Sequence, residues 1–471
     1  MKTTLGLRSR PLPRAASAGR RGFTLTELMV AITGGLIVSI AVYALARDSS
    51  RFYQRESRVG DATSGVVIGF QRLQADIARA GFLSTPNIQA DPRLCFPTGQ
   101  GPATFPAPLR DLASLRIEPP ESGFEPPQVF WDPNAATTDA GPTGDIEPDT
   151  LTVMGSYFAD EAFPIWGATV SAAETAGAPT VTLQHKIGPL SRNGYLTDPA
   201  QRSTILNSIF RPDRILRVID HAGKHFYGII ASATVGAGGV PRIALKTTPP
   251  VQIRSGGAST LCGIEADDLG TASVINVVRY ELRSAKGDLS GISHLADLYP
   301  GLESMDAGTQ ANDLYPFEER RADLVRVELV PTGETGSDVI RVTESTEVIA
   351  EHAVDLGVGI TVVEAINFQN ASAQVASNNL RALPPGDPNI ATYASAPDAA
   401  RTIRPDRIRA VRVRLSVRSP LPDRTSNVDP DAGLGYRVFI PTTDDLPMAW
   451  ARVRTLQADV ALRNAEGALW P

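Results

Sequence analysis

The hydrophobic and polar positions of this chain change character three times, and the first change is the sharpest. The 19 residues from Leu28 to Ala46 carry no charge, whereas residues 1–22 carry six basic side chains and no acidic one. As a helix rising about 1.5 Å per residue, the uncharged run nearly crosses the hydrocarbon core of a bilayer. Because basic flanks stay on the cytoplasmic side, we expect everything after Ala46 across the membrane.

A second pattern follows, with apolar side chains at helical spacing. Steps of three, four or seven residues separate Phe52, Val59, Val66, Phe70, Leu73 and Ile77. This spacing predicts one apolar stripe along a helix that ends near Gly81. Three glycines at positions 60, 65 and 69 each cost such a helix up to about 1 kcal/mol, so packing against a sheet must offset them.

Short β-like segments form the third pattern. Residues 85–149 are rich in Pro, Gly, Ala and Asp, which interrupt regular structure. Apolar runs with turn residues between them then recur at 150–154, 180–183, 214–219, 225–230, 242–246, 274–283 and 324–330. They predict antiparallel strands rather than alternating helices and strands. In residues 411–418, Arg412, Arg414, Ser416 and Arg418 alternate with apolar residues, which favours a solvated sheet face over a binding patch.

These patterns predict an α+β fold. A long N-terminal transmembrane and amphipathic helix is expected to pack on an antiparallel β-sheet head with a large β-rich insert. The expected parts are a basic leader at 1–22, a membrane helix at 23–46, its amphipathic continuation at 47–82, a Pro/Gly-rich and β-rich insert at 83–273, and the sheet head at 274–471.

Glu27 stands at the entrance of the apolar run and needs a partner. A carboxylate in lipid costs on the order of 2.5 kcal/mol or more near the middle of a helix and less near its end. Cleavage of the bond between Gly22 and Phe23 would create a cation at the same depth, the free amine of Phe23.

The stretch Arg21-Gly22-Phe23-Thr24-Leu25-Thr26-Glu27-Leu28, followed by about twenty apolar positions, resembles the prepilin signal of type IV pilins and type II secretion pseudopilins. The resemblance implies that a membrane-embedded prepilin peptidase cleaves after Gly22 and methylates the amine of Phe23. It also implies that Glu27 pairs with that amine on a neighbouring subunit. The expected location is the inner membrane, with a single span and a periplasmic head, and the pilus surface after assembly.

Further segments resemble PilW-type minor pilins in particular. They are residues 73–82 with Cys95 shortly after, 348–356 as a helical turn that leads into a strand, 411–418, and the closing segment 452–464. The implied function is that of a minor pilin at the pilus tip or in an initiating complex, with roles in pilus assembly, cell adhesion and twitching motility. Its partners would be the prepilin peptidase and N-methyltransferase, other major and minor pilins, and membrane lipid.

Other interpretations stay open. Ala44-Leu45-Ala46 fits an ordinary signal peptidase site, although the apolar run is longer than the usual secretory signal. An uncleaved single-span anchor is another alternative. Within the resembling family, a J-type pseudopilin of type II secretion shares the leader. A secreted or anchored β-rich adhesin is the alternative from a different class.

The sequence offers little chemistry. Its two cysteines, Cys95 and Cys262, are either bridged, which a periplasmic location permits, or separate buried thiols. His221 and His225 lack the adjacent glutamate of a metalloprotease motif, and residues 429–433 fit a turn better than a calcium loop. We therefore expect no enzyme, metal or cofactor. The net charge of −6 argues against nucleic-acid binding, which needs clustered basic residues.

Overall fold

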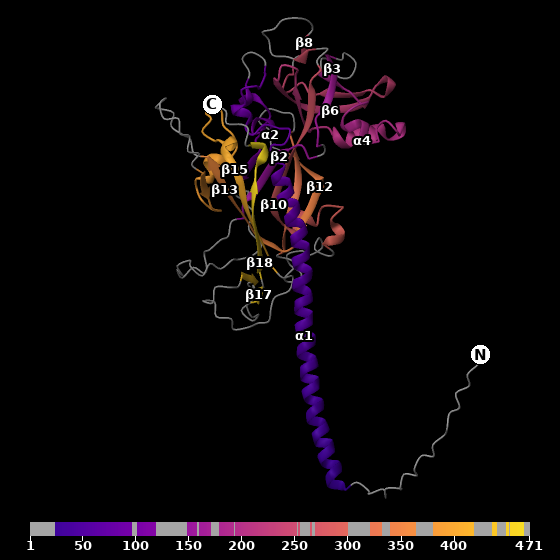
Figure 1. Cartoon of the computed structure of the whole chain (residues 1–471), viewed down its shortest axis with the longest axis vertical. Coiled ribbons are helices and arrows are strands. Elements are labelled where there is room, and N and C mark those ends of the chain that lie inside the picture. The colour runs from indigo at the N-terminus through magenta and orange to yellow at the C-terminus, as the bar shows by residue number, and fades with distance from the viewer. Residues whose placement is uncertain are drawn as a thin grey trace, which may run out of the picture. The chain divides into compact units, whose positions relative to one another are not determined.

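The computed structural model describes residues 24–96, 101–118, 148–157, 160–170, 179–192, 194–251, 253–254, 264–265, 269–299, 321–331, 340–363, 380–418, 436–439, 449–451 and 453–465. The chain divides into two units, residues 1–60 and 61–471. Helix α1 (Leu25–Ala78), labelled in Figure 1, is 54 residues long and contributes residues to both units.

The first unit is the apolar part of α1. Residues Leu25–Ser50 have a mean hydropathy of 2.3, and none of that stretch is buried within the chain. A helix of 26 residues is long and apolar enough to cross a membrane. The chain therefore carries one N-terminal helix of the kind that forms a membrane span.

The second unit holds the amphipathic end of α1, where Val66, Phe70, Leu73 and Ile77 of the predicted stripe are buried. The side chains of Phe52 and Val59, the other two members of that stripe, lie outside the described residues. The helix ends at Ala78, and Gly81 follows with a φ of +76°, which confirms the expected stop. At Gly69 the helix passes so close to a strand that an added Cβ would lie 1.8 Å from the carbonyl oxygen of Ile349. Packing therefore accounts for that glycine, as its helical cost required.

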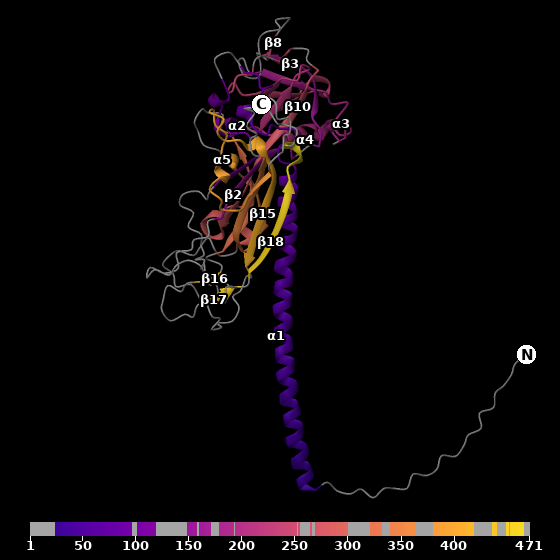
Figure 2. The same ribbon diagram turned by 60° about the vertical axis from the view of Figure 1, so that its left-hand side comes forward.

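A first sheet packs against the amphipathic end of α1. Its antiparallel strands are β1 (Leu115–Glu118), β2 (Thr150–Gly155), β10 (Thr271–Ser284), β11 (Ala322–Val330) and β12 (Ile340–Ala350), in that spatial order. A second sheet has the order β14 (Leu380–Leu383), β13 (Ala353–Val363), β15 (Ile408–Arg418) and β18 (Val453–Ala461). Figure 2 shows β15 beside β18. Side chains of both sheets and of α1 share one core, so the α+β class is confirmed.

Five further strands form a closed barrel with part of β10. They are β3 (Phe163–Val170), β4 (Pro179–Leu183), β5 (Ile215–Ile219), β6 (His225–Val235) and β7 (Pro241–Leu245), and they pair antiparallel in the order β3-β4-β7-β6-β5. Both β3 and β5 also pair with the first half of β10, which closes the ring of six strands. Apolar side chains fill the interior. Strand β10 thus belongs to both the barrel and the first sheet.

Short elements complete the described structure. The helices are α2 (Ala107–Arg110), α3 (Pro189–Arg192), α4 (Arg202–Ile209), α5 (Ile390–Ala394), single turns at Ile88–Ala90, Pro102–Thr104, Pro199–Gln201, Ala237–Gly239, Ala296–Leu298, Pro405–Arg407 and Arg463–Ala465, and a π-helical turn at Ala285–Leu289. Two small pairs are β8 (Ile253–Arg254) with β9 (Ile264–Glu265), and β16 (Tyr436–Phe439) with β17 (Ala449–Ala451).

The structure differs from several of the expectations drawn from the sequence. The expected boundary between residues 273 and 274 falls inside β10, and β1 and β2, which precede it, contribute to the core around α1. The expected helical turn at 348–356 is wrong, because β12 and β13 are joined there by a tight reversal at which His352 has a φ of +54°. In β15 the four apolar residues are buried as predicted, but Ser416 and Arg418 are buried too, so only part of that face is solvated.

Candidate functional site

The first candidate site is the N-terminal turn of α1. The carboxylate of Glu27 accepts hydrogen bonds from the backbone N–H of Thr24 at 3.0 Å and from its hydroxyl at 2.8 Å. In return, the backbone N–H of Glu27 donates to the Thr24 hydroxyl oxygen at 3.3 Å. This reciprocal pair is a capping box, which satisfies N–H groups that the first helical turn leaves without partners. Glu27 is thus held at the N-terminus of the helix, immediately before the apolar run.

An exposed apolar surface follows Glu27 along the helix. The exposed large side chains are Leu28, Met29, Val30, Ile32, Leu36, Ile37, Val38, Ile40, Val42, Tyr43 and Leu45. Soluble proteins rarely expose a continuous apolar surface of this length, whereas the hydrocarbon core of a bilayer accommodates one. Inside the run, the Thr33 hydroxyl donates to the carbonyls of Met29 and Val30, so that this polar group is satisfied within the helix.

The other predicted site residues are placed as follows. Gly22, Phe23, Cys262 and the turn at 429–433 lie outside the described residues. Cys95 is disulfide-bonded and buried. The pairing of Cys95 with Cys262 remains a prediction.

The two histidines differ in their exposure to solvent. His225 is buried, and its imidazole contacts Asp91 Oδ2 at 2.8 Å through Nδ1 and the Arg217 guanidinium at 3.0 Å through Nε2. His221 is exposed, in the turn between β5 and β6. Among the described residues, no group of three or more His, Cys, Asp or Glu side chains could hold a metal ion.

A buried polar cluster connects α1 to the first sheet, and the sequence did not predict it. Asp76 of α1 accepts hydrogen bonds from the Tyr280 hydroxyl at 2.7 Å and from Arg326 Nε at 2.8 Å. The Tyr157 hydroxyl donates to the backbone carbonyl of Asp76 at 3.1 Å. Burial and the nearby Asp76 charge raise the pKa of Tyr280 well above its usual value, so it remains a donor. The amphipathic end of the helix is therefore fixed to β10 and β11 by charge as well as by apolar contact.

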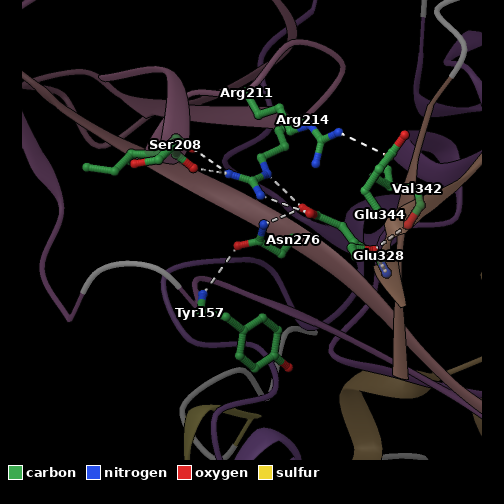
Figure 3. Close-up of polar contacts among 10 residues, drawn as sticks. Tyr157, Ser208, Arg211, Arg214, Asn276, Glu328, Val342 and Glu344 are labelled. Carbon is green, nitrogen blue, oxygen red and sulfur yellow. Dashed lines mark hydrogen bonds and ion pairs between the residues drawn. The ribbon is translucent and has the colours of Figure 1, made fainter. Parts of the chain in front are cut away.

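A second buried cluster lies where β10 leaves the first sheet for the barrel (Figure 3). Arg214, just before β5, forms two hydrogen bonds to the Glu328 carboxylate of β11, at 2.7 and 2.9 Å. The Asn276 side chain of β10 donates to the same carboxylate at 2.6 Å. Both charged side chains are at most 6% exposed. Such paired, bidentate geometry is what a buried ion pair needs to offset its desolvation.

The same guanidinium also terminates a helix. Arg214 Nη1 donates to the carbonyl oxygens of Ser208 and Ile209, at the end of α4, at 2.7 and 2.9 Å. These carbonyls lack partners within the helix, and a cation there is favoured by the helix dipole. Arg214 therefore joins α4 of the barrel region to β11 of the first sheet.

The described residues thus offer two kinds of feature: the buried polar clusters around Asp76 and Glu328, and the continuous exposed apolar surface of α1. Comparison with known proteins adds no assignment, since no protein-family model, curated protein or solved structure matches this chain.

Proposed function

We propose that the chain is a minor pilin of a type IV pilus. The apolar part of α1 anchors it in the inner membrane with its head in the periplasm, and prepilin peptidase removes residues 1–22. The processed subunit is then assembled with other pilins at the pilus tip or in an initiating complex. Its partners are the processing enzyme, which also methylates Phe23, the other pilins and membrane lipid.

The observation that carries the proposal is a carboxylate at the start of an exposed apolar helix. Glu27 belongs to the first turn of α1 and its side chain is exposed, four positions after Phe23. In lipid a lone carboxylate is costly, so a cation at the same depth is favoured. Cleavage before Phe23 supplies that cation next to the helix terminus, on this chain or on an adjacent subunit.

The size of the head supports a low-copy position. A closed barrel and two sheets accompany the amphipathic end of α1. Subunits repeated along a fibre pack their helices closely, and a head of this size would crowd its neighbours. A subunit at one end of the fibre avoids that conflict.

The test is the mass of the mature N-terminus, measured on the protein extracted from membranes of cells that contain a prepilin peptidase. We expect N-methylated Phe23. An N-terminus at Arg47 would indicate ordinary secretion, and a chain that still begins at Met1 would indicate an uncleaved anchor. Either result would overturn the proposal. Recovery with mechanically sheared pili then separates a pilus subunit from a pseudopilin of the secretion system.

A further inference from the structure

Among the strands that the structure describes, β10 alone is shared by the barrel and the first sheet, and its pairing changes in mid-strand. On one edge it pairs with β5 up to Ile275 and with β11 from Val277 onward. On the other edge it pairs with β3 at Thr271 and Ala272, and with β2 from Asn276 onward. Around residues 273–276 the ladder is therefore interrupted on one edge or the other. A strand with incomplete pairing is a natural place for bending.

The buried cluster of Arg214, Glu328 and Asn276 occupies this interruption. Arg214 directly precedes the end of β5 that meets Ile275, and Glu328 lies beside the end of β11 that meets Val277. Asn276, at the change itself, donates to Glu328 and accepts a 3.4 Å hydrogen bond from the backbone N–H of Tyr157, which follows β2. The cluster therefore connects the ends of β5, β11 and β2 to β10 where the pairing of β10 changes (Figure 3).

The cluster is also tied to its surroundings on both sides. Towards the barrel, Arg214 holds the two terminal carbonyls of α4. Towards the first sheet, the backbone N–H of Glu328 donates to the Ser345 hydroxyl of β12 at 2.8 Å. Removal of one partner from such a network leaves a buried charge without its counterion, which disrupts the whole network rather than one bond.

We propose that this cluster holds the barrel and the first sheet together as one rigid body, so that the barrel cannot bend about β10. Arg214 and Glu328 act as positioning residues: they fix the orientation of the barrel relative to the amphipathic end of α1. The cluster would keep every surface of the barrel in a constant orientation relative to the amphipathic end of α1. It does not depend on the proposed role in a pilus, because it concerns contacts within the head alone.

The test measures the distance between the barrel and the second sheet by pulsed electron spin resonance. The second sheet serves as the reference because it shares one core with α1 and the first sheet. Spin labels are attached to the full-length protein in detergent through Thr204→Cys on α4 and Gln457→Cys on β18, both exposed positions. The natural protein, which lacks the two introduced cysteines, is treated with the same spin label and gives the background signal. We expect one narrow distance distribution for the natural cluster. In the R214M/E328L variant, which replaces the ion pair by apolar side chains, the distribution should widen by roughly twofold or more.

A matched control breaks an exposed ion pair in the same region. Arg211 and Glu344 lie 3.5 Å apart with side chains 41% and 74% exposed, so R211M/E344L should leave the distribution narrow. If R214M/E328L fails to fold, as judged by circular dichroism, the isosteric E328Q variant is measured in its place. It should also broaden the distance distribution. An unchanged narrow distribution in the folded cluster variant would overturn the proposal, and so would equal broadening in the control.

Discussion

The side chain of Asn464 closes the end of a helix that was completed 386 residues earlier in the chain. Its amide donates to the carbonyl oxygens of Ala78 at 3.4 Å and of Ala80 at 3.3 Å, where α1 ends. Two positions before it, Leu462 is fully buried in the core that surrounds α1. The last described turn of the chain therefore stabilises the terminus of the first helix.

Loss of this amide should destabilise the head. In Asn464→Ala, the carbonyls of Ala78 and Ala80 lose a donor, and partial access to water limits the cost to about 1 kcal/mol. The thermal unfolding midpoint of the detergent-solubilised protein should fall accordingly. The neighbouring exposed residue provides the control, since Arg463→Ala should leave the midpoint unchanged. Equal effects of the two substitutions would argue against a specific cap.

Two glycines of α1 should respond differently to substitution by alanine. At Gly69 the new methyl group would lie 1.8 Å from the Ile349 carbonyl oxygen, so the helix or β12 must move. We expect Gly69→Ala to lower stability by about 2 kcal/mol, since overpacking outweighs the helical preference for alanine. Gly60 has nothing within 4 Å of an added Cβ. Gly60→Ala should therefore leave the midpoint unchanged or raise it, and thermal unfolding compares the two variants.

Because of Asp149, the head should be more stable in mild acid than at pH 7. Its backbone N–H donates to the Leu356 carbonyl at 2.7 Å, and its carboxylate accepts from the N–H of Val358 at 2.6 Å, which joins the entry of β2 to β13. Burial raises the pKa of Asp149 from 3.8 to about 6, the Val358 hydrogen bond opposes that rise, and the charge of Asp355 adds to it. The folded protein thus binds this proton more tightly than the unfolded chain.

The sign of the pH effect follows from that difference. A raised folded pKa contributes stability that is fully present below about pH 4 and is lost as the pH rises through about 6. At pH 7 the ionised group costs up to about 3 kcal/mol. Asp149→Asn keeps an acceptor for Val358 but carries no charge. It should raise the unfolding midpoint at pH 7 and flatten its dependence between pH 4 and 7, whereas a lower midpoint at pH 7 would contradict this account.

The periodic elements of the fold could be predicted from the sequence. The stripe that includes Phe70 and Leu73 repeats at helical spacing, and the apolar residues of β15 alternate over eight positions, so each pattern reports a local environment. Closure of the barrel could not be predicted in this way. It depends on β3 and β5 meeting the same segment of β10, and short apolar runs contain no information about their distant partners.

The buried charges were missed for a related reason. Asp76, Glu328 and Arg418 occupy positions where an alternating or helical pattern is typical of a wet face, yet each is buried. One signal was present in β11, where Arg326 and Glu328 are flanked on the same face by apolar Leu324 and Val330. Charged residues enclosed in this manner indicate a face covered by another element, with partners that only the fold identifies.

Glu27 allows a test that separates its two chemical roles. Its carboxylate completes a capping box with Thr24, and under the proposed function it also pairs with the amine of Phe23. Glutamine serves in a capping box as well as glutamate but carries no charge. Glu27→Gln should therefore keep the helix terminus and the membrane insertion, while incorporation into sheared pili falls by about tenfold or more, as expected when one charge of a buried pair is removed.

Glu27→Ala is the matched comparison, because it removes both the cap and the charge. If assembly requires the charge, the two variants should be incorporated equally poorly, although both are processed at Phe23 and remain in the membrane fraction. If Glu27→Gln assembles normally and only Glu27→Ala fails, the carboxylate acts as a helix cap alone. Quantitative immunoblotting of sheared pili against the membrane fraction distinguishes these results. Since the glutamine variant loses only a charge, its behaviour decides whether an ion pair at the lipid boundary drives assembly.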